Sequence, residues 1–252
     1  MSQRAVEVAS EAARAAGEIA LKYYTGGFDV TLKADHTPVT QADREAEQAI
    51  TRILRAAFPD HGFLGEEFGG EGRQDRRWII DPIDGTQNFI RGIPIWATLI
   101  ALEEDGEVTA GVVYNPVTRE MHTAQRGGGA FLNGRPIRVS PVSALADSQL
   151  IHAGLGLVRR TPYWDGIVRL LDGTQRQRGF GDYLGYTLVA EGKAELYVEL
   201  DIKPWDVAPC RLLVEEAGGR FTDFTGQPSI FSGTAVASNG RVHDAALAAL
   251  RG

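Results

Sequence analysis

The sequence predicts an α+β fold, and three features along the chain lead to this expectation. Two helical patterns, each with one apolar side, occupy residues 1–24 and 40–58. Residues 95–139 contain β-rich runs divided by Asp-Gly, Asn-Pro and Asn-Gly turn signals, which predict an antiparallel meander. Beyond residue 148, short strand and helix patterns alternate. Helices and an antiparallel meander in separate parts of one chain are typical of the α+β class.

The composition is that of a globular protein. The chain has 252 residues, of which 43% are hydrophobic and 23% are charged, so it can build a substantial core. This length admits one domain or two. Because no flexible linker interrupts the chain, we expect a single unit with two lobes, about 1–140 and 141–252, joined face to face.

The charge and the cysteine content limit the partners and the compartment. The net charge is −7 without any basic block, so we expect no nucleic-acid partner, because a phosphate backbone would be repelled. Cys210 is the only cysteine, which fits a reducing compartment, with the cytoplasm as the default. No stretch approaches the roughly 20 apolar residues that span a bilayer, and the N-terminus lacks the core of a signal peptide. We therefore expect no membrane association.

The N-terminal part of the chain predicts two helices followed by two strands. The second helix opens with Thr40 and has Asp43 three positions on, the spacing of a capping box. Its apolar side consists of Ala42, Ala46, Ala49, Ile50, Ile53, Leu54 and Ala57. After a break at Pro59, the runs FLGEE at 63–67 and WIID at 78–81 are short, apolar and end in acid. They predict buried strands that deliver carboxylates at their ends.

The C-terminal part alternates between strand and helix patterns. Strands are predicted at 148–154, 194–200 and 234–239. Helices are predicted at 161–171, 185–192 and 204–219, and again at the C-terminus. Pro204 lies where a first-turn proline is tolerated, and Gly218 lies where a helix would end.

The segment WIIDPIDGTQNF, residues 78–89, ends an apolar run with two carboxylates. Pro82 restricts the backbone between Asp81 and Asp84, so we expect a turn that lets both side chains point into one space. Carboxylate and carbonyl oxygens suit Mg²⁺, Mn²⁺ or Ca²⁺. A metal ion would also supply the counter-charge that buried acids need.

The residues that follow these acids favour an anion. Gly85 and Thr86 begin what reads as a short helix, and the free amides and positive dipole end of a helix hold anions. Metal and anion sites side by side indicate a phosphate group. By spacing alone, an acidic strand-to-turn junction with a helix cap stays open as the alternative, since turns favour the same residues.

Three segments in combination closely resemble the inositol monophosphatase family of Mg²⁺-dependent, lithium-sensitive phosphatases. They are GEE at 65–67, WIIDPIDGTQNF at 78–89 and KPWDVAPCRLLVEEAGG at 203–219. The resemblance runs from about Ala5 to the end of the chain. It implies a layered αβαβα sandwich, a metal-dependent phosphoric monoester hydrolase, a small-molecule phosphate ester as substrate, and a homodimer. The helix pair, meander and alternating C-terminal part agree with that fold.

The resemblance also implies two Mg²⁺ sites and leaves a third metal open. Glu66, Asp81 and the carbonyl of Ile83 would form one site, and Asp81, Asp84 and Asp206 the second. Asp81 would thus bridge the two ions. Two further residues match accessory positions of the family: Glu67 behind the ligands, and Lys33 on a mobile loop associated with the metals.

The same resemblance implies how the phosphate is held and attacked. The phosphate would lie on Asp84 and on the amides of Gly85 and Thr86. Two metals would activate a water for in-line attack and stabilise the leaving alkoxide. Glu66 and the Thr86 hydroxyl, backed by Asp43, match the positions that orient this water. Asp43 can also be read as part of the helix cap, and the two roles are compatible.

Specificity is expected to depend on Asp182 and Glu199. Counted back from Asp206, Glu199 matches the family position that contacts the hydroxyl side of the substrate. Asp182 matches a loop position that is usually small in inositol phosphatases. Two carboxylates there would suit an ammonium or imidazolium group better than a neutral polyol.

L-Histidinol phosphate carries both cationic groups, and GFGDYLGYTLVAEG at 179–192 resembles the histidinol-phosphatase branch of the family. We therefore expect a histidinol-phosphatase, an activity of histidine biosynthesis. Inositol-1-phosphate and a broader range of sugar phosphates are the alternative substrates. A non-catalytic relative that only binds a metabolite is disfavoured, because a binding module does not need the complete set of acids.

Other residues near this segment have two readings. Asp182 could be only a helix N-cap. Arg178 could touch the substrate or merely bridge the loop. Four aromatic residues could line an imidazole pocket, but at helical spacing they more often belong to a core: Tyr163, Trp164, Tyr183 and Tyr186.

Overall fold

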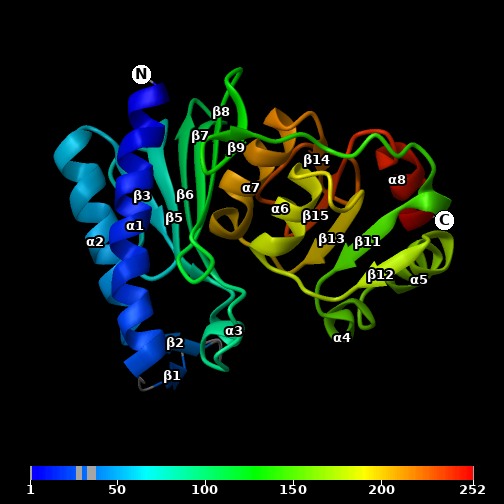
Figure 1. The fold of residues 1–252 in the computed structure, drawn as a ribbon, viewed down its shortest axis with the longest axis horizontal. Coiled ribbons are helices and arrows are strands. Elements are labelled where there is room, and N and C mark those ends of the chain that lie inside the picture. The colour runs from blue at the N-terminus through cyan, green and yellow to red at the C-terminus, as the bar shows by residue number, and fades with distance from the viewer. Residues whose placement is uncertain (1, 27–29, 33–37, 252) are drawn as a thin grey trace.

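The computed structural model describes residues 2–26, 30–32 and 38–251, whose helices and sheets form five layers (Figure 1). Helices α1 (Ser2–Gly26) and α2 (Gln41–Ala57) cover one face of an eight-stranded sheet. Helices α6 (Tyr183–Ala190) and α7 (Pro204–Glu216) lie between this sheet and a five-stranded sheet. The outermost layer consists of α5 (Trp164–Gly173) and α8 (His243–Arg251). The predicted α+β class and αβαβα layering are confirmed.

The eight-stranded sheet has the order β10-β9-β8-β7-β6-β5-β3-β4. Its strands are β3 (Gly62–Gly65), β4 (Gly69–Glu71), β5 (Arg76–Asp84), β6 (Ala97–Glu104), β7 (Glu107–Asn115), β8 (Glu120–Gln125), β9 (Gly129–Leu132) and β10 (Arg135–Pro136). The predicted meander corresponds to β6 through β10, which pair antiparallel in sequence order. By contrast, β3 and β5 are parallel, so both strands end at the same edge.

Alternation along β5 explains how this sheet is buried on both faces. Trp78 and Ile80 belong to the apolar cluster under α1 and α2, whereas Ile79 belongs to the cluster under α7. All three side chains are fully buried. Successive strand residues point to opposite faces, so a continuous apolar run is what a sheet covered on both sides requires.

The five-stranded sheet has the order β12-β11-β13-β15-β14. Its strands are β11 (Gln149–His152), β12 (Arg176–Arg178), β13 (Leu196–Leu200), β14 (Arg220–Thr222) and β15 (Thr234–Ser238). Every strand and helix predicted in the C-terminal part is present. Short elements had not been predicted: β1 (Val30–Leu32), β2 (Pro38–Thr40), β4, β12, β14, α4 (Leu155–Val158) and a 3-10 turn at Leu145–Asp147.

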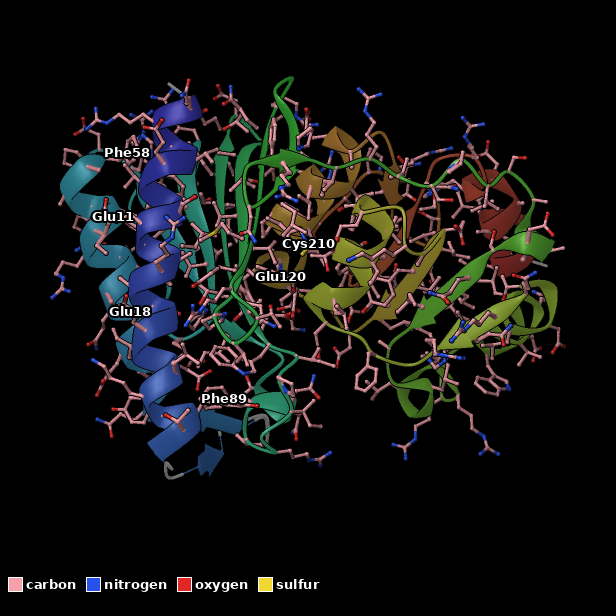
Figure 2. All side chains as sticks on the ribbon, in the orientation of Figure 1. Glu11, Glu18, Phe58, Phe89, Glu120 and Cys210 are labelled. Atoms are coloured by element: carbon pink, nitrogen blue, oxygen red, sulfur yellow. The ribbon has the colours of Figure 1, made fainter. Side chains whose placement is uncertain are left out.

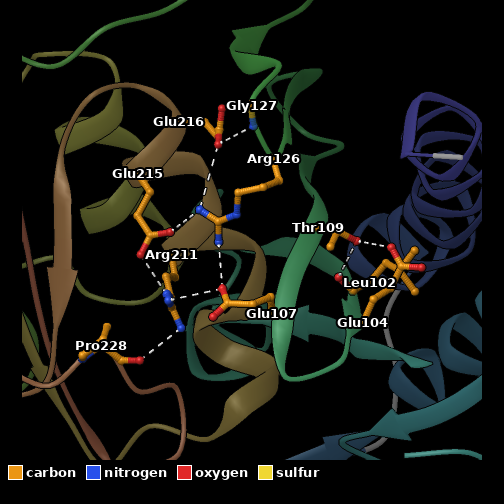
Figure 3. A network of polar contacts seen from close by, with 10 residues as sticks. All are labelled: Leu102, Glu104, Glu107, Thr109, Arg126, Gly127, Arg211, Glu215, Glu216 and Pro228. Atoms are coloured by element: carbon orange, nitrogen blue, oxygen red, sulfur yellow. Dashed lines mark hydrogen bonds and ion pairs between the residues drawn. The ribbon is translucent and has the colours of Figure 1, made fainter. Parts of the chain in front are cut away.

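A polar network anchors the end of α7 to the eight-stranded sheet (Figure 3). Arg211, which is 9% exposed, donates from Nε to Glu215 at 2.8 Å. Arg126 donates to the other Glu215 oxygen at 2.7 Å, and Glu216 accepts from the Gly127 amide at 2.8 Å. Networked, partly buried ion pairs of this kind hold a geometry better than isolated surface pairs. The network therefore fixes the position of α7, whose first turn carries Asp206.

Helix α7 is apolar on most of its circumference because it is covered by both sheets. Figure 2 shows Cys210 between the two sheets, whereas Glu11 and Glu18 lie along the exposed helix α1. Cys210 is fully buried, and burial raises the pKa of its thiol. The thiol therefore stays protonated and behaves as a small apolar group. Along the described part of the chain, no helix combines the length and the apolar character needed to cross a membrane.

His243 predicts an acid-sensitive element of stability. Its ring is fully buried, with Nδ1 2.8 Å from the Ser238 hydroxyl and Nε2 2.9 Å from the Thr222 hydroxyl. Burial, with a smaller contribution from Arg220, lowers the pKa of His243 to about 4. The unfolded chain binds this proton near its ordinary pKa of about 6.5, so the contribution is complete above that pH and is lost as the pH falls toward 4.

We expect wild type to be more stable than His243→Asn at pH 7, and we expect this gap in unfolding free energy to shrink by about 3 kcal/mol between pH 7 and pH 4. Urea unfolding of both proteins across this range measures the gap at each pH. A gap that stays constant would show that the neutral ring is not favoured by the fold.

Candidate active site

Three acids, two of them buried and Asp206 half-buried, meet where the end of β5 lies beside the start of α7. Asp81 and Asp84 come from β5, and Asp206 comes from the first turn of α7. One carboxylate oxygen from each residue lies within 4.8 Å of those of the other two. Asp81 is 2% exposed and Asp84 is 6% exposed. The predicted convergence of these acids, over a hundred residues apart in sequence, is thus present.

Strand β5 presents both acids to one space through an irregularity. In a regular strand, residues three positions apart point to opposite faces. The register of β5 against β6 shifts between Asp81 and Asp84, and this shift changes the direction of the second side chain. The sequence predicted a turn here, but the strand continues to Asp84. Pro82, which has no amide to donate, accepts from the Thr98 hydroxyl through its carbonyl at 2.9 Å.

Local hydrogen bonds orient Asp81, the Ile83 carbonyl and Asp206. The Ile83 amide donates to Asp81 Oδ1 at 2.9 Å, and the Ile83 carbonyl accepts from the Thr86 hydroxyl at 3.1 Å. The Lys203 amide donates to Asp206 Oδ2 at 2.7 Å, because Asp206 is the third residue of a helix that begins at Pro204. Each of these carboxylates keeps an oxygen that is not used by these bonds.

Glu66 follows β3 directly and lies beside Asp81. Its amide donates to the carbonyl of Ile80 at 3.1 Å, which extends the parallel pairing of β3 and β5 by one residue. Burial raises the pKa of Asp81 well above its ordinary value, and the charges of Glu66, Asp84 and Asp206 add to this effect in that order. The two parallel strands therefore deliver their acids to the same place.

The electrostatics of the cluster fit a hard divalent cation. Burial is the largest cause that raises the pKa of Asp84 well above its ordinary value, and that of Asp206 to about 8. Ionising such carboxylates together costs free energy that only a nearby positive charge offsets. An all-oxygen donor set of this kind is suited to Mg²⁺, Mn²⁺ or Ca²⁺.

Gly85 allows the chain to pass closely behind the acids. Its φ of 86° lies in the left-handed region, and a Cβ there would be 2.9 Å from the Ile95 carbonyl oxygen and 3.3 Å from Asp182 Oδ2. Glycine is therefore required both by the conformation and by the available space. Gly85 caps α3 (Thr86–Phe89), the short helix that the sequence predicted. The predicted phosphate contact at Gly85 and Thr86 stays a prediction.

Three other predicted residues are not part of this cluster of acids. Asp43 is 1% exposed in the first turn of α2, and its role behind Thr86 stays a prediction. Lys33 lies outside the described residues. The Glu67 amide donates to Glu47 at 2.9 Å, and the role of the Glu67 side chain behind the metal ligands stays a prediction.

Asp182 and Glu199 form a second acidic pair next to the first cluster. The Asp182 amide donates to Glu199 Oε1 at 3.2 Å, and the Tyr186 hydroxyl donates to Glu199 Oε2 at 2.8 Å. Burial raises the pKa of Asp182 to about 6 and that of Glu199 to about 7. Among the described residues, neither acid is in an ion pair with lysine or arginine. Both charges also raise the pKa of Asp84, which shows that the two acidic groups interact.

Asp182 occupies the N-cap position of α6, as one alternative predicted, but its side chain does not cap the helix. Instead, its Oδ2 accepts from Asn88 Nδ2 at 2.9 Å, across 94 positions of sequence. Its φ of 58° and ψ of −161° are a strained combination for a residue with a side chain. The next amide, that of Tyr183, donates to Asp84 at 2.6 Å.

The four aromatic residues considered for an imidazole pocket pack in the protein interior instead. Tyr183 is 3% exposed and binds Asn115 through its hydroxyl, and Tyr186 is fully buried in the central core. Tyr163 and Trp164 pack in the cluster under α5 and α8. The core reading of these aromatics thus prevails. Arg178 is exposed on the edge strand β12 and donates to the Gln177 carbonyl.

Two residues that support the site were not among those predicted from the sequence. Asn88 binds Asp182, and it lies in the quoted segment one turn after Gly85. Glu47 is 2% exposed and accepts the amides of Glu67 and Phe68. An acid on the otherwise apolar side of a helix, four positions after Asp43, is the signal that could have identified it.

The layered fold and an all-carboxylate cluster that can hold a metal ion point to a metal-dependent class of protein. More particularly, the chain belongs to the inositol monophosphatase family, whose family model matches residues 1–252. This is a family of metal-dependent phosphatases, as the resemblance of the three acidic segments implied.

Relatives of this chain carry more than one name. It is 41% identical over 238 residues to a histidinol-phosphatase of Chlorobaculum parvum, and the match covers 92% of this chain and 91% of the relative. It is 43% identical to a histidinol-phosphatase of Mycobacterium tuberculosis, with 89% and 90% covered. It is also 38% identical to an inositol-1-monophosphatase of Mesorhizobium japonicum, with 100% and 94% covered.

Solved structures agree with the fold. The extragenic suppressor protein suhB of Bartonella henselae superimposes with a TM-score of 0.92 at 37% identity, and 98% of each chain is covered. An inositol monophosphatase of Thermotoga maritima has a TM-score of 0.88 at 35% identity, with 100% of this chain and 97% of that chain covered.

Proposed function

We propose that this phosphatase hydrolyses L-histidinol phosphate to L-histidinol and phosphate. The observation that carries the choice of substrate is the acidic pair of half-buried Asp182 and buried Glu199, which lies beside the cluster of Asp81, Asp84 and Asp206. The names of the two relatives that are 41% and 43% identical support the same choice. The name of the inositol-1-monophosphatase that is 38% identical supports the alternative, inositol-1-phosphate.

In this proposal, Glu66, Asp81, the Ile83 carbonyl, Asp84 and Asp206 hold two or three Mg²⁺ ions. When bound, these ions supply positive charge that favours ionisation of water and offsets the charge of the phosphoryl group and of the leaving oxygen. The number of carboxylates suits this role, because bound cations offset their mutual repulsion while all of them stay ionised.

The protein's own groups then bind and orient the reactants. The amides of Gly85 and Thr86 donate to the phosphate oxygens at the start of α3. Glu66 and the Thr86 hydroxyl, supported by Asp43, orient the attacking water in line with the ester bond. Holding reactants in such an arrangement is a large part of catalysis of phosphoryl transfer. No covalent intermediate with the protein is required.

The leaving group is recognised by charge. The Asp182 and Glu199 carboxylates accept from the ammonium and imidazolium groups of histidinol, and these cations would offset the free-energy cost of burying the two acids. The strained backbone at Asp182 agrees with a functional role, since such conformations persist mostly where function requires them. A neutral polyol offers the pair no compensating charge.

Replacing Asp182 by asparagine tests the choice of substrate. Asparagine has the same shape, tolerates a positive φ and can still accept from Asn88, so the charge is the main change. We expect the ratio of kcat/KM for L-histidinol phosphate to that for inositol-1-phosphate to fall about 10- to 100-fold, the size expected for loss of one charge-assisted hydrogen bond. Phosphate release with Mg²⁺ measures both rates.

Asp201→Asn is the matched control. Asp201 also has a positive φ, of 61°, but its side chain is 70% exposed. We expect this variant to keep the wild-type ratio. A wild type that hydrolyses inositol-1-phosphate equally well, or an unchanged ratio in Asp182→Asn, would instead place the protein with the inositol-type enzymes. The absence of turnover on any phosphate ester with Mg²⁺ present would favour a non-catalytic relative.

A further inference from the structure

The turn that carries Glu66 leads from a buried strand to the surface of the protein. It connects β3 to β4, and β4 is exposed along its whole length. Phe68, at the end of the turn, is 56% exposed. A surface pocket of about 560 Å³ lies against the turn and is lined in part by Phe68 and Glu47. The C-terminal side of the turn is therefore not held by apolar packing of Phe68 or β4.

Glu47 binds the backbone of this turn. Its carboxylate comes from α2 and is buried beneath the turn. Oε2 accepts from the Glu67 amide at 2.9 Å, and Oε1 accepts from the Phe68 amide at 3.3 Å. Each oxygen thus binds one of the two amides that directly follow Glu66. Hydrogen bonds from amides to a carboxylate are stronger than neutral ones, so this pair can define the turn.

Gly65 leaves room for this carboxylate. A Cβ at Gly65 would lie 1.9 Å from Glu47 Oε1, far inside contact distance. The φ of Gly65 is not in the left-handed region, so the backbone does not demand glycine here. Space for Glu47 is therefore the reason for glycine immediately before Glu66.

Keeping Glu47 buried is costly. Burial raises its pKa to about 7, even though the two amides act in the opposite direction. The nearby charges of Glu67 and Glu66 raise it further. An apolar side chain would avoid this cost, so the contact is not explained by stability alone.

We infer that Glu47 is a positioning residue, which fixes the turn after β3 and so aims the Glu66 carboxylate at Asp81. The inference deepens the proposed function, since it concerns how one expected Mg²⁺ ligand is oriented. Supporting groups behind a metal ligand commonly change metal affinity without touching the metal.

Two variants remove the contact in different ways. Glu47→Gln keeps the size of the side chain but leaves only one acceptor oxygen for the two amides and places an NH₂ group against the other. Gly65→Ala keeps Glu47 and displaces its carboxylate. Glu45→Gln, on the same helix, is the matched control, because the Glu45 carboxylate accepts from the Gln41 side chain instead.

The first measurement is hydrogen exchange of single amides by NMR in the metal-free proteins. We expect the amides of Glu67 and Phe68 to exchange about tenfold faster or more in both variants, as expected for loss of a charge-assisted hydrogen bond. The Asn133 amide, bonded to Met121 at the far side of the sheet, should keep its wild-type rate and so reports that the fold is intact.

The second measurement is Mg²⁺ binding to the same metal-free proteins by calorimetry. We expect the Kd for Mg²⁺ to rise roughly 10- to 100-fold in Glu47→Gln and Gly65→Ala, and not in Glu45→Gln. In turnover assays, the Mg²⁺ concentration for half-maximal rate should rise in parallel, while KM for the ester at saturating Mg²⁺ should not change. A role limited to stability would not produce this selective effect.

Unchanged exchange at Glu67 and Phe68, or an unchanged Kd for Mg²⁺ in both variants, would overturn the inference. The proposed function is tested separately by turnover of the wild type. If wild type hydrolyses no ester but the variants still lose amide protection and Mg²⁺ affinity, the positioning role stands and the proposed function fails.

Discussion

Asp81→Asn is expected to abolish phosphate release and, at the same time, to make the metal-free protein more resistant to unfolding. Asp81 lies between Glu66, Asp84 and Asp206, and these charges raise its pKa, so its ionised form opposes the fold when no cation is present. Asparagine removes this repulsion and can still accept the Ile83 amide. The midpoint of thermal unfolding in EDTA should therefore rise.

Addition of Mg²⁺ should reverse the order of the two proteins. Ligand binding stabilises the folded wild type by about 2.7 kcal/mol when the concentration is a hundred times Kd, and the variant should lose most of this gain. Its kcat/KM should fall at least about a thousandfold, because metal ions contribute several kcal/mol to such reactions. Asp172→Asn, on the exposed side of α5, serves as the control for both measurements.

A variant Asp81→Asn that keeps Mg²⁺-dependent stabilisation would show that the cluster does not hold the ion. A variant that is less stable in EDTA would show that the acids are not under repulsion. The two readouts are independent, since one is made without metal and the other with it.

Gly85→Ala is expected to cause the second large effect. The added methyl group would meet the Ile95 carbonyl oxygen at 2.9 Å, and backbone cannot yield as a flexible side chain can. We expect α3 to move and kcat to fall about 100-fold, as misplacement by about 1 Å can cause. The free energy of unfolding should fall by about 1–3 kcal/mol from the strain of a positive φ and the contact.

Gly92→Ala separates conformational strain from the steric contact. Gly92 has a φ of 70°, close to the 86° of Gly85, but no atom lies within 4 Å of a Cβ built there. This control should lose about 1 kcal/mol of stability through its backbone and keep its activity. Equal losses of kcat in both variants would show that the close approach at Gly85 has no role in the site.

Long elements could be predicted from the sequence because their apolar patterns are extended. Helices α1 and α2 repeat an apolar pattern over several turns, whereas β6, β7 and α7 are long apolar runs bounded by turn signals or by Pro204 and Gly218. Short elements could not be predicted: β12 and β14 have three residues each, and α4 has four. The two strands are stabilised by neighbouring strands from elsewhere in the chain, and three or four residues are too few to show a period.

The acids of the site could be predicted as a group but not as a geometry. A carboxylate at the end of a buried apolar run needs a counter-charge, which a metal ion can supply. Asp81, Asp84 and Glu66 could therefore be recognised as candidate metal ligands. The shift in register between Asp81 and Asp84 was not, because it depends on how β5 pairs with β6. The contact of Asn88 with Asp182 was also invisible, since it joins the two halves of the chain.

The sequence by itself determined the long elements and the oxygen donors suited to Mg²⁺. These properties depend on residue type and on spacing within single segments. Only the tertiary structure decided which oxygens meet, that Asp182 turns to Asn88 instead of capping its helix, and that Glu47 supports the turn after β3. The physical reason is that these distances result from the packing of layers whose residues are far apart along the chain.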